Sequence, residues 1–129
     1  MNINELVNDI CNKCGTRDPF ELSDFYNIKV HYDRLGKIYG YFINAYETKY
    51  IVINEELDYE EKVKTCAHEL GHAFLHSEYN TPFMLNKTNL VVNRFELEAN
   101  RFMSSLLYPD DIFNEYIDLP IDNSSHILG

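Results

Sequence analysis

The chain has 129 residues, 45% of them hydrophobic, which suggests one domain over residues 1–129 with a modest core and argues against general disorder. Its formal net charge of −10 disfavours direct binding to nucleic acid or anionic lipid. No segment has the ~18–20 consecutive apolar residues of a membrane-spanning helix, and the N-terminus lacks the pattern of a signal peptide. We therefore expect a cytoplasmic protein without a membrane partner.

A first helix is expected over residues 3–14, where apolar side chains recur at helical spacing before Gly15. Within it, Cys11 and Cys14 form a C-x-x-C, but no second pair of cysteines exists to complete a four-cysteine zinc site. We expect both cysteines to be small apolar residues on the inner face of this helix, with a redox role as the alternative.

A short second helix should follow, because Asp18 can cap it and Pro19 suits its first turn. The hydrophobic period then changes to two, which is typical of strands. With a turn at residues 33–37, this alternation predicts strands at residues 28–32, 38–44 and 49–54. We interpret them as a small antiparallel meander.

The second half of the chain is predicted to be mainly helical. A long helix should run from about Tyr59 to Ser77, with Asp58 as its cap and Glu61 three residues later. The remaining segments are expected to be a loop at residues 81–92, a helix at residues 93–108 before Pro109, a short helix at residues 110–117 and a tail at about 117–129. The predicted fold class is α+β, a small three-stranded antiparallel sheet packed against a helical bundle.

Three histidines stand four residues apart in the long helix. His68, Glu69 and His72 form H-E-x-x-H, and His76 adds a further step of four. Imidazoles at positions i and i+4 point two nitrogens at a common spot, which is the arrangement that a metal needs. Glu69 lies at the rim of that spot, where a carboxylate can take a proton from a water that zinc has acidified. The segment therefore predicts a zinc site with Glu69 as the catalytic base.

The third ligand must come from another element, because four residues advance about 6 Å along a straight helix. His76 is therefore too far along the axis to bind the same metal ion as His68 and His72. We expect His76 to support a ligand histidine or to lie at the surface.

Glu96 and Glu98 are the candidates on the next helix. Glu98 is flanked by arginines and is expected to form an ordinary salt bridge on the helix surface. Glu96 has no such cation partner and lies beside a stripe of buried side chains, where an unpaired carboxylate is costly. We therefore favour Glu96 as the third ligand. Asn100 shares its face and can fix the tautomer of a ligand histidine, or can simply face solvent.

Three motifs together resemble the ImmA/IrrE family of small zinc metallopeptidases. They are HELGH at residues 68–72, ELEANRF at residues 96–102 and LLYP at residues 106–109. The stretch DPFELSDFYNIKVHY at residues 18–32 is similar to the family's short helix and first strand. The resemblance implies a zincin-like fold with a gluzincin-like site, in which His68, His72 and Glu96 hold Zn²⁺ and Glu69 is the base. It also implies that Asn100 stands where related peptidases carry Asp.

The resemblance implies a function as well. Such proteins are often encoded by phages and other mobile elements, and they cleave a helix-turn-helix repressor at a specific site. We therefore expect a zinc-dependent endopeptidase acting on such a repressor or another regulator, with an edge strand of the sheet holding the substrate. The residue that stabilises the oxyanion is left open among Tyr32, Tyr39, Tyr41, Tyr108, His31 and His76.

Two alternatives do not involve proteolysis. The domain could hold zinc structurally and sequester a regulator, or it could act as a toxin–antitoxin partner. A structural zinc site is normally closed by four protein ligands, whereas the sequence offers three together with a well-placed Glu69, which favours the enzyme. The metal could also be another divalent ion.

Overall fold

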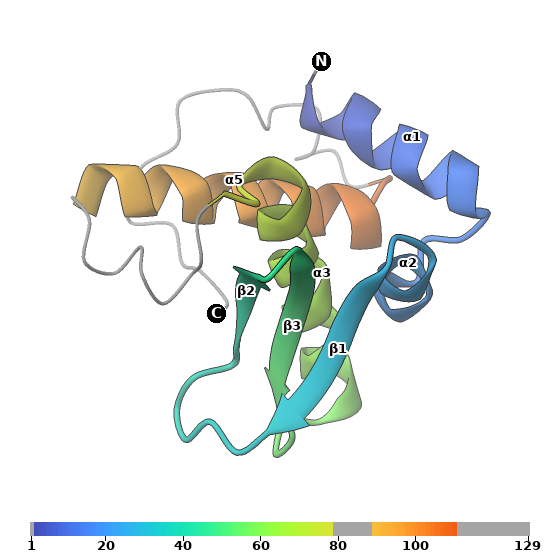
Figure 1. The fold of residues 1–129 in the computed structure, drawn as a ribbon. Coiled ribbons are helices and arrows are strands. Elements are labelled where there is room, and N and C mark those ends of the chain that lie inside the picture. The colour runs from blue at the N-terminus through green and yellow to red at the C-terminus, as the bar shows by residue number, and fades with distance from the viewer. Residues whose placement is uncertain (1, 79–88, 111–129) are drawn as a thin grey trace.

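Three strands and four helices make up the part of the chain that the computed structural model describes, residues 2–78 and 89–110. Helix α2 packs on β1, α3 packs on β2 and β3, and α5 crosses α3 and also contacts α1 (Figure 1). The predicted α+β class is confirmed. The elements are α1 (Ile3–Cys14), α2 (Pro19–Phe25), β1 (Ile28–Asp33), β2 (Gly40–Ala45), β3 (Thr48–Asn54), α3 (Tyr59–Leu75) and α5 (Asn89–Leu107).

The two N-terminal helices begin and end at the predicted signals. Gly15 adopts a left-handed conformation with φ 87° and donates its backbone N–H to the carbonyl of Cys11, which ends α1. The carboxylate of Asp18 accepts the backbone N–H of Phe20 and caps α2. Cys11 is buried and Cys14 is half-buried, so the predicted apolar role agrees with their positions, and burial raises the pKa of both thiols.

The sheet is mixed, so the prediction of an antiparallel meander was wrong in both the direction and the order of the strands. The order is β1-β3-β2, with β3 parallel to β1 and antiparallel to β2. Strand β3 lies at the centre, and its side chains of Ile51 and Ile53 are completely buried, as is typical of a strand covered on both sides by neighbouring strands. Residues 34–39 therefore pass across the end of β3 instead of forming a tight turn.

Asn54 holds this crossing segment in place. Its side-chain amide donates to the carbonyls of Gly36 and Ile38, each at 3.0 Å, and its backbone N–H donates to the carbonyl of Tyr39 at 2.8 Å. Strands β2 and β3 are joined by a two-residue turn at Tyr46 and Glu47, whose φ angles of 51° and 64° match a type I′ hairpin turn.

The long helices differ from prediction mainly at their ends. Asp58 caps α3 as expected, but the helix ends at Leu75 instead of Ser77. Helix α5 already begins at Asn89, so residues 89–92, which were expected to belong to a loop, are helical. The rest of that loop, most of the predicted helix at 110–117 and the tail at about 117–129 lie outside the described residues. None of the helices in the described segments has the length and hydropathy of a membrane-spanning helix.

Gly71 allows α3 and α5 to approach closely. A Cβ atom built at Gly71 would lie 2.9 Å from the Cα of Ala99 and 3.0 Å from the Cβ of Phe102, which is too close for carbon atoms. Ala99 and Phe102 are completely buried, so neither can move aside into solvent. The absence of a side chain at position 71 therefore sets the separation of the two helices.

We predict that Gly71→Ala will destabilise the metal-free protein by about 1–3 kcal/mol, because the added methyl group overpacks the contact between the helices. This loss should exceed the gain in helix propensity that alanine brings. Thermal unfolding followed by circular dichroism would measure the change. Glu60→Ala, on the same helix with a side chain 78% exposed, is the control and should shift stability by less than ~0.5 kcal/mol. A Gly71→Ala variant as stable as the wild type would contradict the account.

Candidate metal centre

Helix α3 presents its motif side chains to α5 instead of to water. His68, Glu69 and His72 are all completely buried. The opposite face, with Cys66, Ala67 and Leu70, belongs to the hydrophobic core. Buried polar groups of this kind are stable only where other polar or charged groups meet them.

Helix α5 supplies the group that meets both histidines. The two carboxylate oxygens of Glu96 lie 2.9 Å from Nε2 of His68 and 2.9 Å from Nε2 of His72. The structure thus brings together the three side chains that the sequence analysis predicted as ligands, each with one donor atom within 4.8 Å of the others. Glu96 is also buried, with 7% of its surface exposed.

The donor set fits a divalent transition metal. Two imidazole nitrogens and a carboxylate oxygen are typical zinc ligands, and tetrahedral ligands at about 2.0–2.1 Å stand about 3.3 Å from one another. Nε2 of His72 lies close to Glu96 but has no hydrogen-bond partner within the described residues. A nitrogen that faces an oxygen at this distance without hydrogen-bond geometry is expected where lone pairs converge on a shared cation.

The charges of the metal-free site compensate one another. Burial raises the pKa of Glu96, but its close contacts with Nε2 of His68 and Nε2 of His72 outweigh burial and hold that pKa at about 2. Burial likewise lowers the pKa of His68, but its contacts with Glu96 outweigh burial and raise it. Nε2–H of His68 can donate to the carboxylate of Glu96 in the metal-free protein, and metal binding at Nε2 would displace that proton.

Glu69 stands apart from these contacts. Both of its carboxylate oxygens are buried and have no hydrogen-bond partner among the described residues. Burial raises the pKa of Glu69 and outweighs the lowering effect of His68 and His72. An unpartnered carboxylate with a raised pKa beside a donor cluster has the properties of a general base.

Asn100 lies behind His68, one turn after Glu96 on α5. Its Oδ1 is 2.8 Å from Nδ1 of His68, so Nδ1–H can donate to the amide oxygen. This contact leaves Nε2 of His68 facing Glu96, and it is the arrangement that the sequence analysis expected of Asn100.

His76 is buried and contacts the cluster through His72. The two Nδ1 atoms of His72 and His76 are 3.3 Å apart, and Nε2 of His76 is 2.7 Å from Oε1 of Glu98. Glu98 was expected to form a salt bridge with an arginine, and Nε of Arg94 does lie 3.9 Å from its Oε2. The shorter contact with His76 was missed, because nothing in the spacing of one helix reveals what faces it from another.

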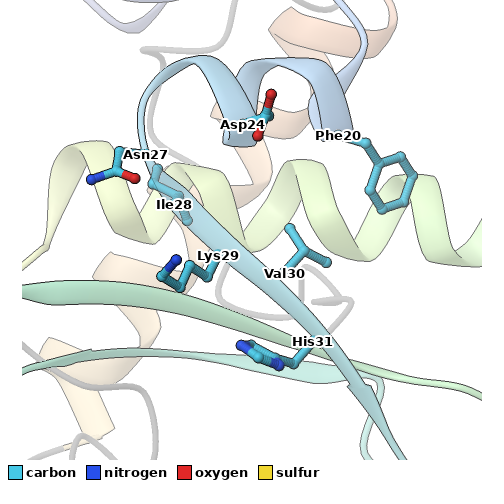
Figure 2. Close-up of a pocket in the computed structure, with 7 residues that line it drawn as sticks. All are labelled: Phe20, Asp24, Asn27, Ile28, Lys29, Val30 and His31. Carbon is cyan, nitrogen blue, oxygen red and sulfur yellow. The ribbon is translucent and has the colours of Figure 1, made fainter.

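A groove of about 430 Å³ is lined by residues of α2 and β1 (Figure 2). None of the residues of the donor cluster lines it. His31, one of the residues considered for the oxyanion, lines it and therefore faces a different part of the surface. Among those candidates, His76 contacts the cluster directly. The lining residues are Phe20, Asp24, Asn27, Ile28, Lys29, Val30 and His31.

Comparison with known proteins agrees with the site. The profile of peptidase family M78, described as the IrrE N-terminal-like domain, matches residues 24–122. An uncharacterized immunity region protein 2 of Bacillus phage phi105 is 40% identical over 115 residues, which cover 88% of this chain and 73% of that protein. Metallopeptidase ImmA of Bacillus subtilis (strain 168) is 32% identical over 115 residues, which cover 88% of this chain and 67% of that protein. The chain belongs to the ImmA/IrrE family of metallopeptidases.

Proposed function

We propose that the chain is a zinc-dependent endopeptidase, with His68, His72 and Glu96 as the metal ligands and Glu69 as the general base. The observation that carries the proposal is the buried cluster of three donors beside a carboxylate without a partner. Three protein ligands leave a coordination position open, as a catalytic zinc site requires and a structural site does not.

The chain's own residues divide the work of peptide hydrolysis. Zinc, when bound, would acidify a water molecule and polarise the substrate carbonyl. Glu69 accepts the proton of the attacking water and later gives it to the leaving nitrogen of the peptide. Asn100 orients His68, and the burial of the cluster strengthens each of these electrostatic interactions.

Strand β2 is the element suited to hold the substrate. It is an edge of the sheet within the described residues, and it packs against α3. The side-chain amide of Asn44 on β2 donates to the carbonyl of Ser77, just beyond the end of α3, at 2.7 Å. An extended segment added to β2 would run along the helix that carries Glu69.

The proposed substrate is a helix-turn-helix repressor, or another regulator, encoded by a phage or mobile element. The similarity to an immunity region protein of a phage supports this choice. The net charge of −10 suits a partner with a basic face, such as a DNA-binding protein. We further propose that residues 1–129 form one metallopeptidase domain that acts in the cytoplasm.

We predict that His72→Ala and Glu96→Ala will each abolish stoichiometric zinc binding, because each removes one of three ligands. Zinc at one hundred times its Kd should stabilise the wild type by about 2.7 kcal/mol, and both variants should lose this stabilisation. Thermal unfolding with and without zinc, together with metal analysis, measures both effects. His31→Ala and Glu55→Ala are matched controls and should bind zinc like the wild type. Retention of zinc by Glu96→Ala would show that the third ligand is a different residue.

Glu69→Gln tests catalysis separately from metal binding. The amide is nearly isosteric but cannot take a proton, so we predict normal zinc content and a fall in cleavage rate of about 10²–10⁴-fold. Cleavage would be followed with a purified helix-turn-helix repressor of a phage or mobile element as the substrate, with Glu55→Gln as the control.

Two results would oppose the proposal. Undiminished cleavage by Glu69→Gln would reject Glu69 as the base. Full release of the repressed gene by a variant that cleaves nothing would favour sequestration of the regulator, the alternative in which the zinc site has no catalytic part.

A further inference from the structure

Three side chains in contact with one another lead from the donor cluster toward solvent. They run from His72 through His76 to Glu98, with contacts of 3.3 Å and 2.7 Å. His72 and His76 are one turn apart on α3 and its C-terminal cap, whereas Glu98 comes from α5. The side chain of Glu98 is 28% exposed, so these contacts link the completely buried imidazole of His72 to a carboxylate that water can reach.

The direction of these hydrogen bonds follows from the groups at the two ends. An ionised carboxylate can only accept, so Nε2–H of His76 must donate to Glu98. In neutral His76 the other nitrogen, Nδ1, then carries a lone pair and accepts Nδ1–H from His72. His72 is thereby fixed in the tautomer whose Nε2 lone pair faces Glu96 and Nε2 of His68, which is the tautomer that a metal ligand needs.

The ring of His76 is held so that this arrangement persists. Its side chain is only 3% exposed, and its centroid lies 4.2 Å from that of Phe95 on α5. The next residue, Ser77, is tied to the sheet by the hydrogen bond from Asn44. Rotation of the His76 ring away from His72 would break this packing.

We propose that Glu98 and His76 are positioning residues for the metal, acting as a carboxylate–histidine relay onto His72. This inference rests on the metal site of the proposed function. Asn100 orients His68 through a neutral amide, which brings no negative charge to that ligand. Glu98 supplies that charge through His76 to the other histidine, which makes His72 a stronger donor.

The relay can be tested by zinc affinity, measured in competition with a chromophoric chelator. Glu98→Gln and His76→Phe should each weaken zinc binding about 10-fold or more, as loss of such partners does elsewhere. The double variant should bind no more weakly than His76→Phe, because Glu98 acts only through His76. His76→Gln should recover part of the loss, since its amide can accept from His72 and donate to Glu98.

Glu78→Gln is the matched control for charge. Glu78 lines a small pocket of about 180 Å³ together with His76, so a general electrostatic effect would weaken zinc binding in this variant too. The relay predicts an affinity within twofold of the wild type. If His76→Phe does not fold, the comparison of Glu98→Gln with Glu78→Gln still shows whether Glu98 contributes more to zinc affinity than another nearby carboxylate does.

Wild-type affinity in Glu98→Gln, or losses that multiply in the double variant, would overturn the relay and leave the proposed function intact. A wild-type chain that binds no zinc would overturn the metal site of the proposed function and the relay with it.

Discussion

The close crossing of α3 and α5 is the contact on which the rest of the site depends. Gly71 faces Ala99 at a separation that leaves no room for a Cβ atom. Gly71 lies between His68 and His72 in the sequence of α3, and Ala99 lies between Glu96 and Asn100 in that of α5. The contact of Gly71 with Ala99 therefore sets the distances from the carboxylate and the amide to the two histidines. It places Glu96 at 2.9 Å from both histidines and Asn100 at 2.8 Å from His68. A wider crossing would break all three contacts together.

This crossing also explains why so much polar surface is tolerated in the interior. His68, Glu69, His72 and Glu96 would each be costly to bury alone. In the metal-free protein the close contacts of Glu96 with Nε2 of His68 and Nε2 of His72 hold the pKa of Glu96 at about 2. Glu69 is the exception, because it is buried without a partner among the described residues. Groups left unsatisfied in this way are found where a bound ligand or a catalytic step supplies the missing partner.

Local signals in the sequence predicted the parts of the structure that depend on local physics. Caps at Asp18 and Asp58 and the stop at Gly15 act within a few residues, so the helix boundaries they mark were correct. The proximity of Glu96 to the histidines was also predictable, because a carboxylate on a buried stripe without a cation partner needs something positive nearby. The order of the strands was not predictable, since it depends on contacts between strands and helices that are far apart in the sequence. The pairing of Glu98 with His76 was missed for the same reason: it joins side chains of two helices.

X-ray absorption spectroscopy at the zinc edge of the zinc-loaded protein would test whether His68, His72 and Glu96 hold the metal. We predict four light-atom ligands at about 2.0–2.2 Å, with the scattering pattern of two imidazole rings and the remaining positions filled by oxygen. A zinc–sulfur distance of about 2.3 Å, or the signature of three or four imidazoles, would contradict it.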